Sequence, residues 1–398
     1  MAFKKESKPF VSRAQRRLDE KIKEEKKEKM SAGKIIRRSL LCFFTVIICV
    51  FVAVFSCLYV VVNGDCEPLR IKLVLSAMQA SATKWVPGLF MPQAEVDKIV
   101  ADSYVVNTDV MSLEEYQQMM LESSKDETSD KWANAKDGML FETIQGATFT
   151  GYVLVVKDPS RMFVGTSSDF KNGLPGITIF DMAKKEDAIA IINAGEYMDP
   201  GGSGTGNNPM GITYSKGSCV WSDSLKRTFI GFDKDNKLVV TEPMTKTKAE
   251  ELGIRDGVSF QNGNVLITSE GGNVTMHYAD NNTGTAQRTA IGQAADGSVI
   301  LLVTDGRSAS SLGATRNDVI DVMVKYGAIT AGMLDGGSSS LMYYEDYITK
   351  FGYDESKLDQ YQKKGLINRY KAFTTPRRMP TYYCVAREGT NQALKEAE

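Results

Sequence analysis

The longest hydrophobic run of the chain lies near its start and covers residues 39–62, with 24 residues and no Asp, Glu, Lys or Arg. A bilayer core of about 30 Å needs roughly 20 apolar residues in a helix, and a helix satisfies its own backbone hydrogen-bonding groups. A soluble helix of this length nearly always has a polar face, which this run lacks. The pattern therefore predicts one transmembrane helix, with Leu40–Val62 as its apolar part.

The charges before this run indicate its orientation. Residues 1–38 carry 14 Lys and Arg against 6 Asp and Glu, with Lys34, Arg37 and Arg38 next to the span. The positive-inside rule places a basic end in the cytoplasm. We therefore expect a cell-membrane protein with a cytoplasmic tail and an extracytoplasmic C-terminal domain. A basic stretch beside a membrane is typical of topology and anionic lipid, so we expect no nucleic-acid partner.

A cleaved signal peptide is the alternative interpretation of the same run. Signal peptides have an apolar region of about 7–15 residues after a short basic stretch. Here the apolar region is longer, the preceding stretch has 38 residues, and residues 63–66 (Asn-Gly-Asp-Cys) form no clear cleavage site. The sequence favours an uncleaved anchor.

Two amphipathic stretches follow the span. Residues 66–82 and 94–125 carry apolar side chains at spacings of three and four, which predicts helices separated at Pro87 and Pro92. We interpret residues 63–137 as a helical stalk or linker between the membrane and the following domain.

The pattern changes after Met139, where short β-rich runs alternate with Gly and Asn. Helices are predicted at residues 245–252 and 317–326. No repeat of 20–50 residues is visible. The pattern predicts one sheet-rich α+β domain over residues 138–390. Its strands are expected at residues 147–156, 188–192, 228–232, 238–241, 264–268, 288–291, 299–303 and 380–386.

Histidine and cysteine usage excludes several kinds of site. His277 is the single histidine, which excludes a multi-His zinc site and leaves no basis for a Ser-His-Asp triad. Three cysteines lie outside the span: Cys66, Cys219 and Cys384. Their odd number and wide spacing form no disulfide framework, although a pairing of Cys219 with Cys384 stays open.

Polar and glycine-rich segments follow several of the predicted strands. Aspartates directly after buried strands are candidates for chemistry, glycines let a backbone approach a ligand, and an arginine can clamp an anion. Each segment alone is weak, because an Asp-Gly pair is often only a turn. The segments are Asn-Ala-Gly-Glu-Tyr at 193–197, the glycine-rich loop at 199–211, Arg-Thr-Ala-Ile-Gly at 288–292, Asp-Gly-Arg at 305–307 and Leu-Asp-Gly-Gly-Ser-Ser-Ser at 334–340.

Taken in this order, the segments resemble the phosphodiester glycosidase family. That family's pattern is Asn-Gly-Gly-Phe-Phe, Arg-Thr-Ala-Ile-Gly, Asp-Gly-Arg, a helix, and Leu-Asp-Gly-Gly-Gly-Ser-Ser. A closing arginine before the last strand is matched by Arg377 or Arg378, and the resemblance covers roughly residues 140–388. The chain departs from the pattern at Ala194, Glu196 and Ser338, and Glu196 adds an acid beside the expected site.

The resemblance implies hydrolysis of a sugar-1-phosphodiester, of the N-acetylglucosamine-1-phosphate type, at the glycosidic C–O bond. The catalytic candidates are Asp335 and Asp305, with Glu196 as a third. Arg288 and Arg307 are expected to stabilise the departing phosphate. The remaining candidates for holding sugar or phosphate oxygens are Asn193, Gly195, Gly306, Gly336, Gly337, Ser338 and Ser339.

We expect a polymeric carbohydrate phosphodiester as the partner, because bacterial members of the family are associated with exopolysaccharide and the cell envelope. No cofactor is predicted firmly. Calcium is a candidate ligand of Asp280, Asn281 and Asn282, although no EF-hand spacing is present. Two other functions stay open: a non-catalytic glycan-binding envelope protein, and a hydrolase or transferase that cleaves P–O bonds of teichoic-acid-like polymers.

Overall fold

The computed structural model describes residues 12–28, 32–64, 67–78, 83–102, 106–123, 131–168, 170, 174–199, 206–279, 284–306, 311–370 and 374–390 of the chain. The chain divides into two compact units, residues 1–66 and residues 67–398. Each unit is described by itself.

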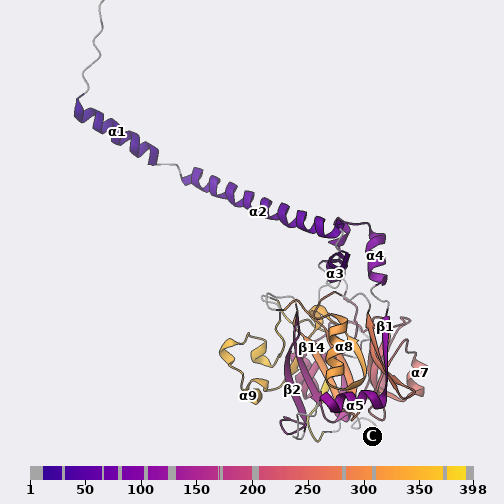
Figure 1. Ribbon diagram of the computed structural model, residues 1–398. Coiled ribbons are helices and arrows are strands. Elements are labelled where there is room, and N and C mark those ends of the chain that lie inside the picture. The colour runs from indigo at the N-terminus through magenta and orange to yellow at the C-terminus, as the bar shows by residue number, and fades with distance from the viewer. Residues whose placement is uncertain are drawn as a thin grey trace, which may run out of the picture. The chain divides into compact units, whose positions relative to one another are not determined.

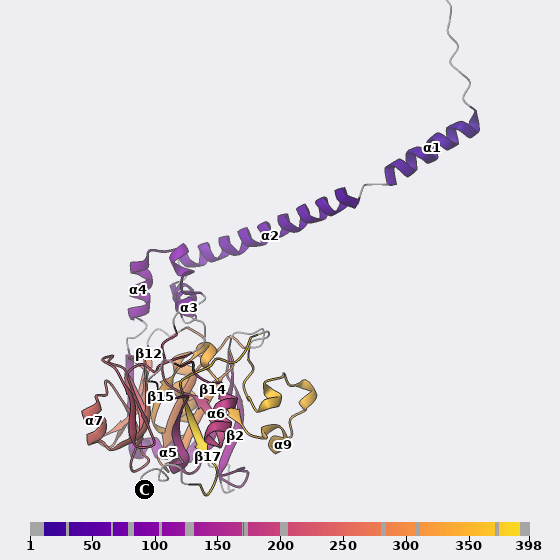
Figure 2. The same ribbon diagram turned by 180° about the vertical axis from the view of Figure 1, so that it is seen from behind.

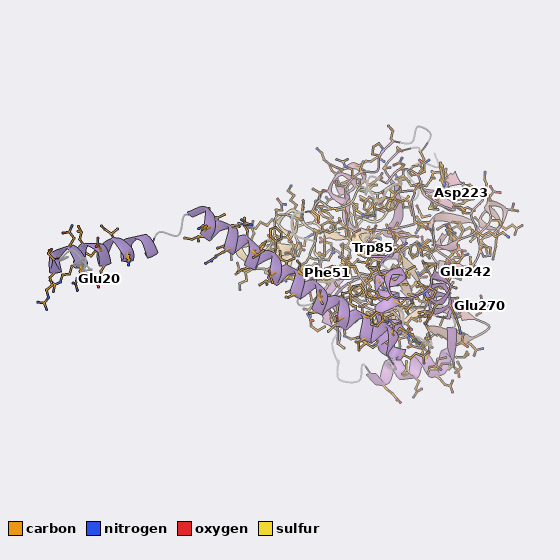
Figure 3. All side chains as sticks on the ribbon, turned by 90° about the horizontal axis from the view of Figure 1, so that it is seen from above. Glu20, Phe51, Trp85, Asp223, Glu242 and Glu270 are labelled. Carbon is orange, nitrogen blue, oxygen red and sulfur yellow. The ribbon has the colours of Figure 1, made fainter. Side chains whose placement is uncertain are left out.

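The first unit contains the helices α1 (Arg13–Glu28) and α2 (Ala32–Asn63). The predicted span lies within α2, which is long and apolar enough to cross a membrane. No residue of its most apolar window is buried. Phe51, labelled in Figure 3, is 68% exposed. An apolar helix whose most apolar window is exposed fits the prediction of a membrane span by length and composition.

The second unit begins with α3 (Glu67–Met78) and α4 (Gln93–Asp102), but the helix predicted over residues 94–125 is wrong at its centre. Val106–Ser112 forms the strand β1, which pairs antiparallel with β12 (Asn273–Ala279). β1 alternates β-branched Val106, Thr108 and Val110 with other residues, a pattern that suits a strand better than a helix.

The helix α5 (Leu113–Ser123) follows β1 and also packs on the large sheet. Its Tyr116 is 1% exposed, and the Tyr116 hydroxyl donates a hydrogen bond of 2.9 Å to the Ala328 carbonyl. Residues 106–123, expected in the stalk, thus pack within the sheet-rich domain.

The described strands of this domain form three antiparallel sheets, with helices at their faces (Figure 1). This arrangement confirms the predicted α+β class. The largest sheet has the order β1-β12-β11-β15-β13-β14-β3-β2. Its further strands are β2 (Met139–Gln145), β3 (Thr150–Val156), β11 (Val265–Glu270), β13 (Thr289–Ala294), β14 (Val299–Thr304) and β15 (Ala328–Leu334).

The two smaller sheets have the orders β7-β6-β10-β8-β9 and β16-β5-β17-β4. The first is formed by β6 (Ile212–Ser215), β7 (Ser218–Ser222), β8 (Thr228–Asp233), β9 (Leu238–Thr241) and β10 (Ile254–Phe260). The second is formed by β4 (Met162–Thr166), β5 (Ala188–Asn193), β16 (Met342–Tyr344) and β17 (Thr381–Ala386).

Helices cover the outer faces of these sheets. In Figure 2, α6 lies beside β17, which it contacts. The α-helices of this part are α6 (Ile179–Glu186), α7 (Lys246–Glu251), α8 (Arg316–Lys325) and α9 (Tyr347–Phe351). Short 3-10 turns are η1 (Pro87–Leu89), η2 (Pro159–Arg161), η4 (Gly337–Ser339), η5 (Glu355–Lys357) and η6 (Gln362–Lys364).

The central strands of the large sheet are buried on both faces, which explains the continuous apolar sequence of β14. Leu301 and Val303 belong to one core, together with Ile192 of β5. The alternate residues Ile300 and Leu302 belong to a second core, under α8. Successive side chains of a strand point to opposite faces, so a strand between two cores needs apolar residues throughout. β13, β14 and β15 are thus held rigidly, and the residues at their ends are placed accurately.

The pairing of Cys219 with Cys384 does not occur in the structure. Cys219 lies in β7 and Cys384 in β17, strands of two different sheets, and both thiols are free.

Candidate active site

Asp335 directly follows β15, a strand in the middle of the large sheet. Its backbone nitrogen donates to the Ala194 carbonyl at 3.1 Å, which ties the end of β15 to the segment after β5. Its Oδ1 accepts a 2.9 Å hydrogen bond from the Gly336 nitrogen. Protein surrounds the carboxyl group, although part of the residue reaches solvent. Two sheets therefore fix the position of one carboxylate.

The turn after Asp335 needs its two glycines. A side chain at Gly336 would place its Cβ 2.9 Å from the Gln287 carbonyl oxygen, and Gly337 has a left-handed φ of 62°. Tyr370 holds the same turn, because its hydroxyl donates to the Ser338 carbonyl at 2.9 Å. The structure therefore gives both glycines a role in shaping the turn that carries Asp335.

The surroundings of Asp335 shift the pKa of its carboxyl group toward neutral pH. Burial, with a smaller contribution from the nearby charge of Glu196, raises the pKa of Asp335 to about 6. A hydrogen bond from Ser339, the charge of Arg377 and the Gly336 nitrogen act in the opposite direction. A carboxyl group with this pKa exchanges its proton readily at neutral pH, which is what an acid–base or nucleophilic role requires.

A chain of polar contacts leads from Asp335 to a cation. The Ser339 Oγ lies 3.2 Å from the Tyr197 hydroxyl. Arg377 Nη1 donates to that hydroxyl at 3.0 Å and to Asp199 Oδ2 at 3.1 Å. Burial, followed by the Asp335 charge, raises the pKa of Tyr197, so this hydroxyl keeps its proton. The chain orients Ser339 and places positive charge close to the Asp335 carboxylate.

Asn193 lies beneath this cluster and is completely buried. Its Nδ2 donates to the Asp335 carbonyl at 2.6 Å, and its Oδ1 accepts hydrogen bonds from Thr289 Oγ1 at 2.8 Å and from the Leu341 nitrogen at 3.0 Å. All of these partners are protein groups. Asn193 therefore joins β5, β13 and the Asp335 turn, and acts on the site by positioning it.

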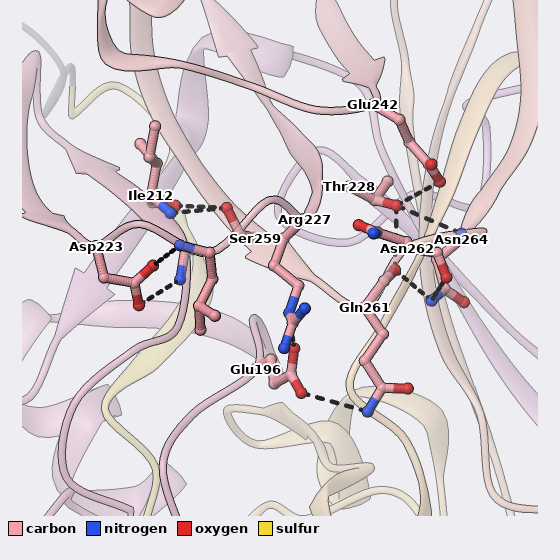
Figure 4. Close-up of polar contacts among 12 residues, drawn as sticks. Glu196, Ile212, Asp223, Arg227, Thr228, Glu242, Ser259, Gln261, Asn262 and Asn264 are labelled. Atoms are coloured by element: carbon pink, nitrogen blue, oxygen red, sulfur yellow. Dashed lines mark hydrogen bonds and ion pairs between the residues drawn. The ribbon is translucent and has the colours of Figure 1, made fainter.

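Glu196 reaches the site from the segment after β5. Its Oε2 accepts a 2.7 Å ion-paired hydrogen bond from Arg227 Nε, and its Oε1 accepts one of 3.3 Å from Gln261 (Figure 4). The preceding Gly195 lies so close to β10 that a Cβ there would come 2.7 Å from the Ser259 carbonyl oxygen. The Glu196 nitrogen also donates to that oxygen, at 2.9 Å. Both the backbone and the carboxylate of Glu196 are thus fixed.

Asp305, at the end of β14, has partners for both carboxylate oxygens. Oδ2 accepts a hydrogen bond of 3.0 Å from the Tyr152 hydroxyl, and Oδ1 accepts one of 2.9 Å from the Arg369 nitrogen. The residue is 7% exposed, and burial raises the pKa of Asp305. The next residue, Gly306, packs so closely on the Gln287 side chain that a Cβ there would force that side chain to move. Asp305 thus anchors the segment around Arg369.

Of the two arginines predicted to bind phosphate, the structure describes Arg288 but not Arg307. Arg288 is buried, and it donates from Nε to the Ala314 carbonyl at 3.1 Å and from Nη2 to the Gly284 carbonyl at 2.6 Å. It thus holds two backbone segments together. Arg307 lies outside the described residues, as do the calcium candidates at residues 280–282. The described part of the chain contains no group of three or more His, Cys, Asp or Glu residues suited to hold a metal.

Sequence reasoning did not assign several residues of this cluster. Tyr197 closes the first motif and Arg377 precedes the last strand, so the family pattern offered a signal for both. Arg227 and Gln261 lie in no motif, and they meet Glu196 only because β10 and the start of β8 lie next to the segment after β5.

A family model described as phosphodiester glycosidase matches residues 186–386, about half of the chain. The match contains Glu196, Asp305, Asp335 and Arg377. The chain belongs to the phosphodiester glycosidase family. The resemblance found in the sequence motifs is thereby confirmed.

Individual relatives of this family member are distant. It is 26% identical over 193 residues to the SPbeta prophage-derived uncharacterized protein YomE of Bacillus subtilis (strain 168), a match that covers 46% of this chain and 27% of that protein. The chain thus spans about a quarter of that relative's length.

Two solved structures are similar in part. One is the zebrafish N-acetylglucosamine-1-phosphodiester alpha-N-acetylglucosaminidase catalytic domain auto-inhibited by pro-peptide, with 18% identity, a TM-score of 0.47, and coverage of 72% of this chain and 90% of that one. The other is a putative exported protein from Burkholderia pseudomallei K96243, with 13% identity, a TM-score of 0.41, and coverage of 74% and 88%.

Proposed function

We propose that this protein is a membrane-anchored hydrolase that acts outside the cytoplasm on sugar-1-phosphodiesters and cleaves the glycosidic C–O bond. The observation that carries the proposal is Asp335. Within the segment that matches the family, it is a carboxylate fixed by two sheets, with a pKa of about 6 and a cation close by.

The chemistry of this substrate suits a site with one adjustable carboxylate. Water adds to the anomeric carbon, the C–O bond breaks, and its electron pair leaves with the phosphate monoester. That leaving group is weakly basic, so a strong general acid matters less than it does for ordinary glycosides. The oxocarbenium-like sugar still needs a carboxylate as nucleophile or base. Asp335 fills this role in its ionised form, held by Gly336 and Ser339.

Positive charge near the carboxylate supports the same reaction. Negative charge grows on the departing phosphate, and cations already in position stabilise it without reorganisation. Arg377 supplies such a cation and also favours the ionised form of Asp335. The contacts of Arg377 with Tyr197 and Asp199 keep its guanidinium in place before substrate arrives.

The N-terminal unit supports the proposed location. α2 is apolar over residues 39–62, and the basic residues that precede this run favour a cytoplasmic N-terminus. The glycosidase domain would then face phosphodiester-linked glycans of the envelope or exopolysaccharide. In this account the substrate is a sugar, such as N-acetylglucosamine, linked through phosphate to a polymer.

The test is Asp335→Asn in the 398-residue chain, purified in detergent and assayed on an N-acetylglucosamine 1-phosphodiester. We expect kcat to fall about 10²- to 10⁴-fold, the usual contribution of one positioned acid–base group. The matched control is Asp235→Asn, which removes an equal charge from an exposed turn. Unchanged turnover by Asp335→Asn would remove Asp335 from the reaction.

A further inference from the structure

Arg227 lies directly before β8, and one edge of its guanidinium group is held by a hydrogen bond. Its Nε donates to Glu196 Oε2 at 2.7 Å (Figure 4). Its aliphatic part runs along Gly211, where a Cβ would lie 3.3 Å from Arg227 Cγ. The stem and one edge of the guanidinium are therefore fixed.

The opposite edge of the same guanidinium is open. Neither terminal nitrogen of Arg227 has a hydrogen-bond or ion-pair partner among the described residues, and neither is a buried polar atom. The side chain is 23% exposed. The two other arginines of the region differ, because Arg377 uses Nη1 for Tyr197 and Asp199, and Arg288 uses Nη2 for a backbone carbonyl.

Glu196 connects Arg227 to the reacting group. Its carboxylate is held by Arg227 and Gln261, and its backbone nitrogen by the Ser259 carbonyl. Its charge acts on Asp335 directly. Arg227 is thus linked through Glu196 to the segment after β5, whose Ala194 carbonyl accepts a 3.1 Å hydrogen bond from the Asp335 nitrogen.

We infer that Arg227, anchored by Glu196, binds the phosphate of the substrate through its two terminal nitrogens. This inference rests on the proposed function and names the phosphate-binding residue of the same site. Two parallel N–H groups match two phosphate oxygens, which is the strongest geometry that arginine offers to an anion. Because Glu196 already fixes the side chain, little conformational freedom is lost on binding.

The role of Glu196 follows from this arrangement. A carboxylate beside a phosphate site repels the ligand, unless an arginine lies between the two and neutralises it. Here the ion pair orients the cation and leaves its other edge for the anion. Glu196 is therefore a positioning residue for Arg227, and Gln261 supports Glu196 from the other side.

The first experiment compares Arg227→Ala with Lys226→Ala in the 398-residue chain in detergent. Lys226 is the exposed neighbour in the same loop, so both variants lose one positive charge. On an N-acetylglucosamine 1-phosphodiester, we expect kcat/KM of Arg227→Ala to fall about 10- to 100-fold, as for loss of a charge-assisted contact. Lys226→Ala should stay within about twofold of the unaltered protein. Equal values for the two variants would overturn the inference.

Two further variants separate binding from folding. Arg227→Lys keeps the charge without the planar fork, and its kcat/KM should lie between those of the unaltered protein and Arg227→Ala. Glu196→Gln frees the guanidinium, so it should weaken phosphate binding less than Arg227→Ala does. If Arg227→Ala has a lowered melting temperature, Arg227→Lys alone decides, and an unchanged kcat/KM in it would contradict a bidentate contact.

A binding measurement distinguishes failure of this inference from failure of the proposed function. Isothermal titration compares N-acetylglucosamine 1-phosphate with N-acetylglucosamine, so it needs no turnover. Arg227→Ala should weaken binding of the phosphate compound about 10- to 100-fold and leave the plain sugar unchanged. A protein that hydrolyses nothing but shows this difference refutes the proposed function alone. Equal losses for both compounds, or no binding of the phosphate compound by the unaltered protein, overturn the inference.

Discussion

The ends of β14 and β15 present the same sequence feature in two different settings. Both strands pair with β13, both are apolar, and each is followed by Asp-Gly. At the end of β14, both oxygens of Asp305 accept hydrogen bonds from Tyr152 and Arg369. At the end of β15, Asp335 faces Ser339, the charge of Arg377 and the carboxylate of Glu196.

The difference shows that partners, rather than position on a strand, decide what an aspartate does. Asp305 accepts hydrogen bonds on both oxygens from a neutral hydroxyl and a backbone amide, and burial raises its pKa while the positive charge of Arg369 lowers it. Asp335 lies near charged groups of opposite sign, Arg377 and Glu196, which change its pKa in opposite directions. We therefore propose that Asp305 anchors the segment around Arg369 and that Asp335 is the reacting group.

The largest expected effect is a difference in kcat between the Asp335→Asn and Asp305→Asn variants. Asp335→Asn should lose about 10²- to 10⁴-fold in kcat, while Asp305→Asn keeps its kcat within about tenfold wherever it is folded. Steady-state kinetics on an N-acetylglucosamine 1-phosphodiester measure both. If the rates fell in the opposite order, the two roles would be exchanged.

The free energy of unfolding should be lowered in Asp305→Asn, the variant that keeps its catalytic rate. In Asp305→Asn an amide NH₂ faces either Tyr152 or the Arg369 amide, so one buried donor loses its acceptor. The expected cost is about 1–3 kcal/mol of unfolding free energy. Thermal denaturation measures this cost, and an Asp305→Asn variant as stable as the unaltered protein would show that Asp305 is no anchor.

Asp335→Asn should be more stable than the unaltered protein at pH 7.5 and equal to it near pH 4. The folded protein holds the Asp335 proton up to a pKa of about 6, whereas an ordinary aspartate has a pKa of 3.8. Between these values the folded state binds more protons than the unfolded state, so the contribution of Asp335 to stability falls as pH rises. Asparagine mimics the protonated form at every pH. Melting curves at the two pH values test this, and a stabilisation that does not depend on pH would contradict the raised pKa.

The smallest effect concerns the pH profile. If Asp335 acts as a carboxylate, kcat/KM rises with pH through an apparent pKa of about 6. Arg377→Gln removes a charge that lowers this pKa, so its profile should move to higher pH. Glu196→Gln removes a charge that raises the pKa, so its profile should move to lower pH. Shifts of both variants in the same direction would show that these charges do not act on the reacting group.

The sequence predicted much of the sheet but not its edge. β14 is predictable because a strand between two cores is continuously apolar, and β9 because a short β-branched run is bounded by turn residues. β1 was missed because it is an exposed edge strand, whose pairing with β12 depends on residues more than 150 positions away. Short strands of this kind are specified by their partners rather than by their own periodicity.

The site was predictable only as far as it lies in local motifs. Asp335 and Ser339 lie in one motif, so the sequence predicts both as site residues. From the sequence alone, Asp305 and Asp335 are equally good catalytic candidates. Tyr152 and Arg369, which contact Asp305, are distant from it in the chain and give no local signal. Arg227 and Gln261 carry no signal of their own, since each meets Glu196 through the packing of two sheets.

The central claim is that Asp335 promotes cleavage of the glycosidic C–O bond of a sugar-1-phosphodiester. The most direct test is hydrolysis of an N-acetylglucosamine 1-phosphodiester in ¹⁸O-labelled water, followed by mass spectrometry of the products. Our account predicts ¹⁸O in the free sugar, unlabelled phosphate monoester, and greatly reduced product with Asp335→Asn. Label in a phosphate group would mean P–O cleavage and would contradict the account, whether the products are sugar phosphate and free alcohol or free sugar and a labelled phosphate monoester.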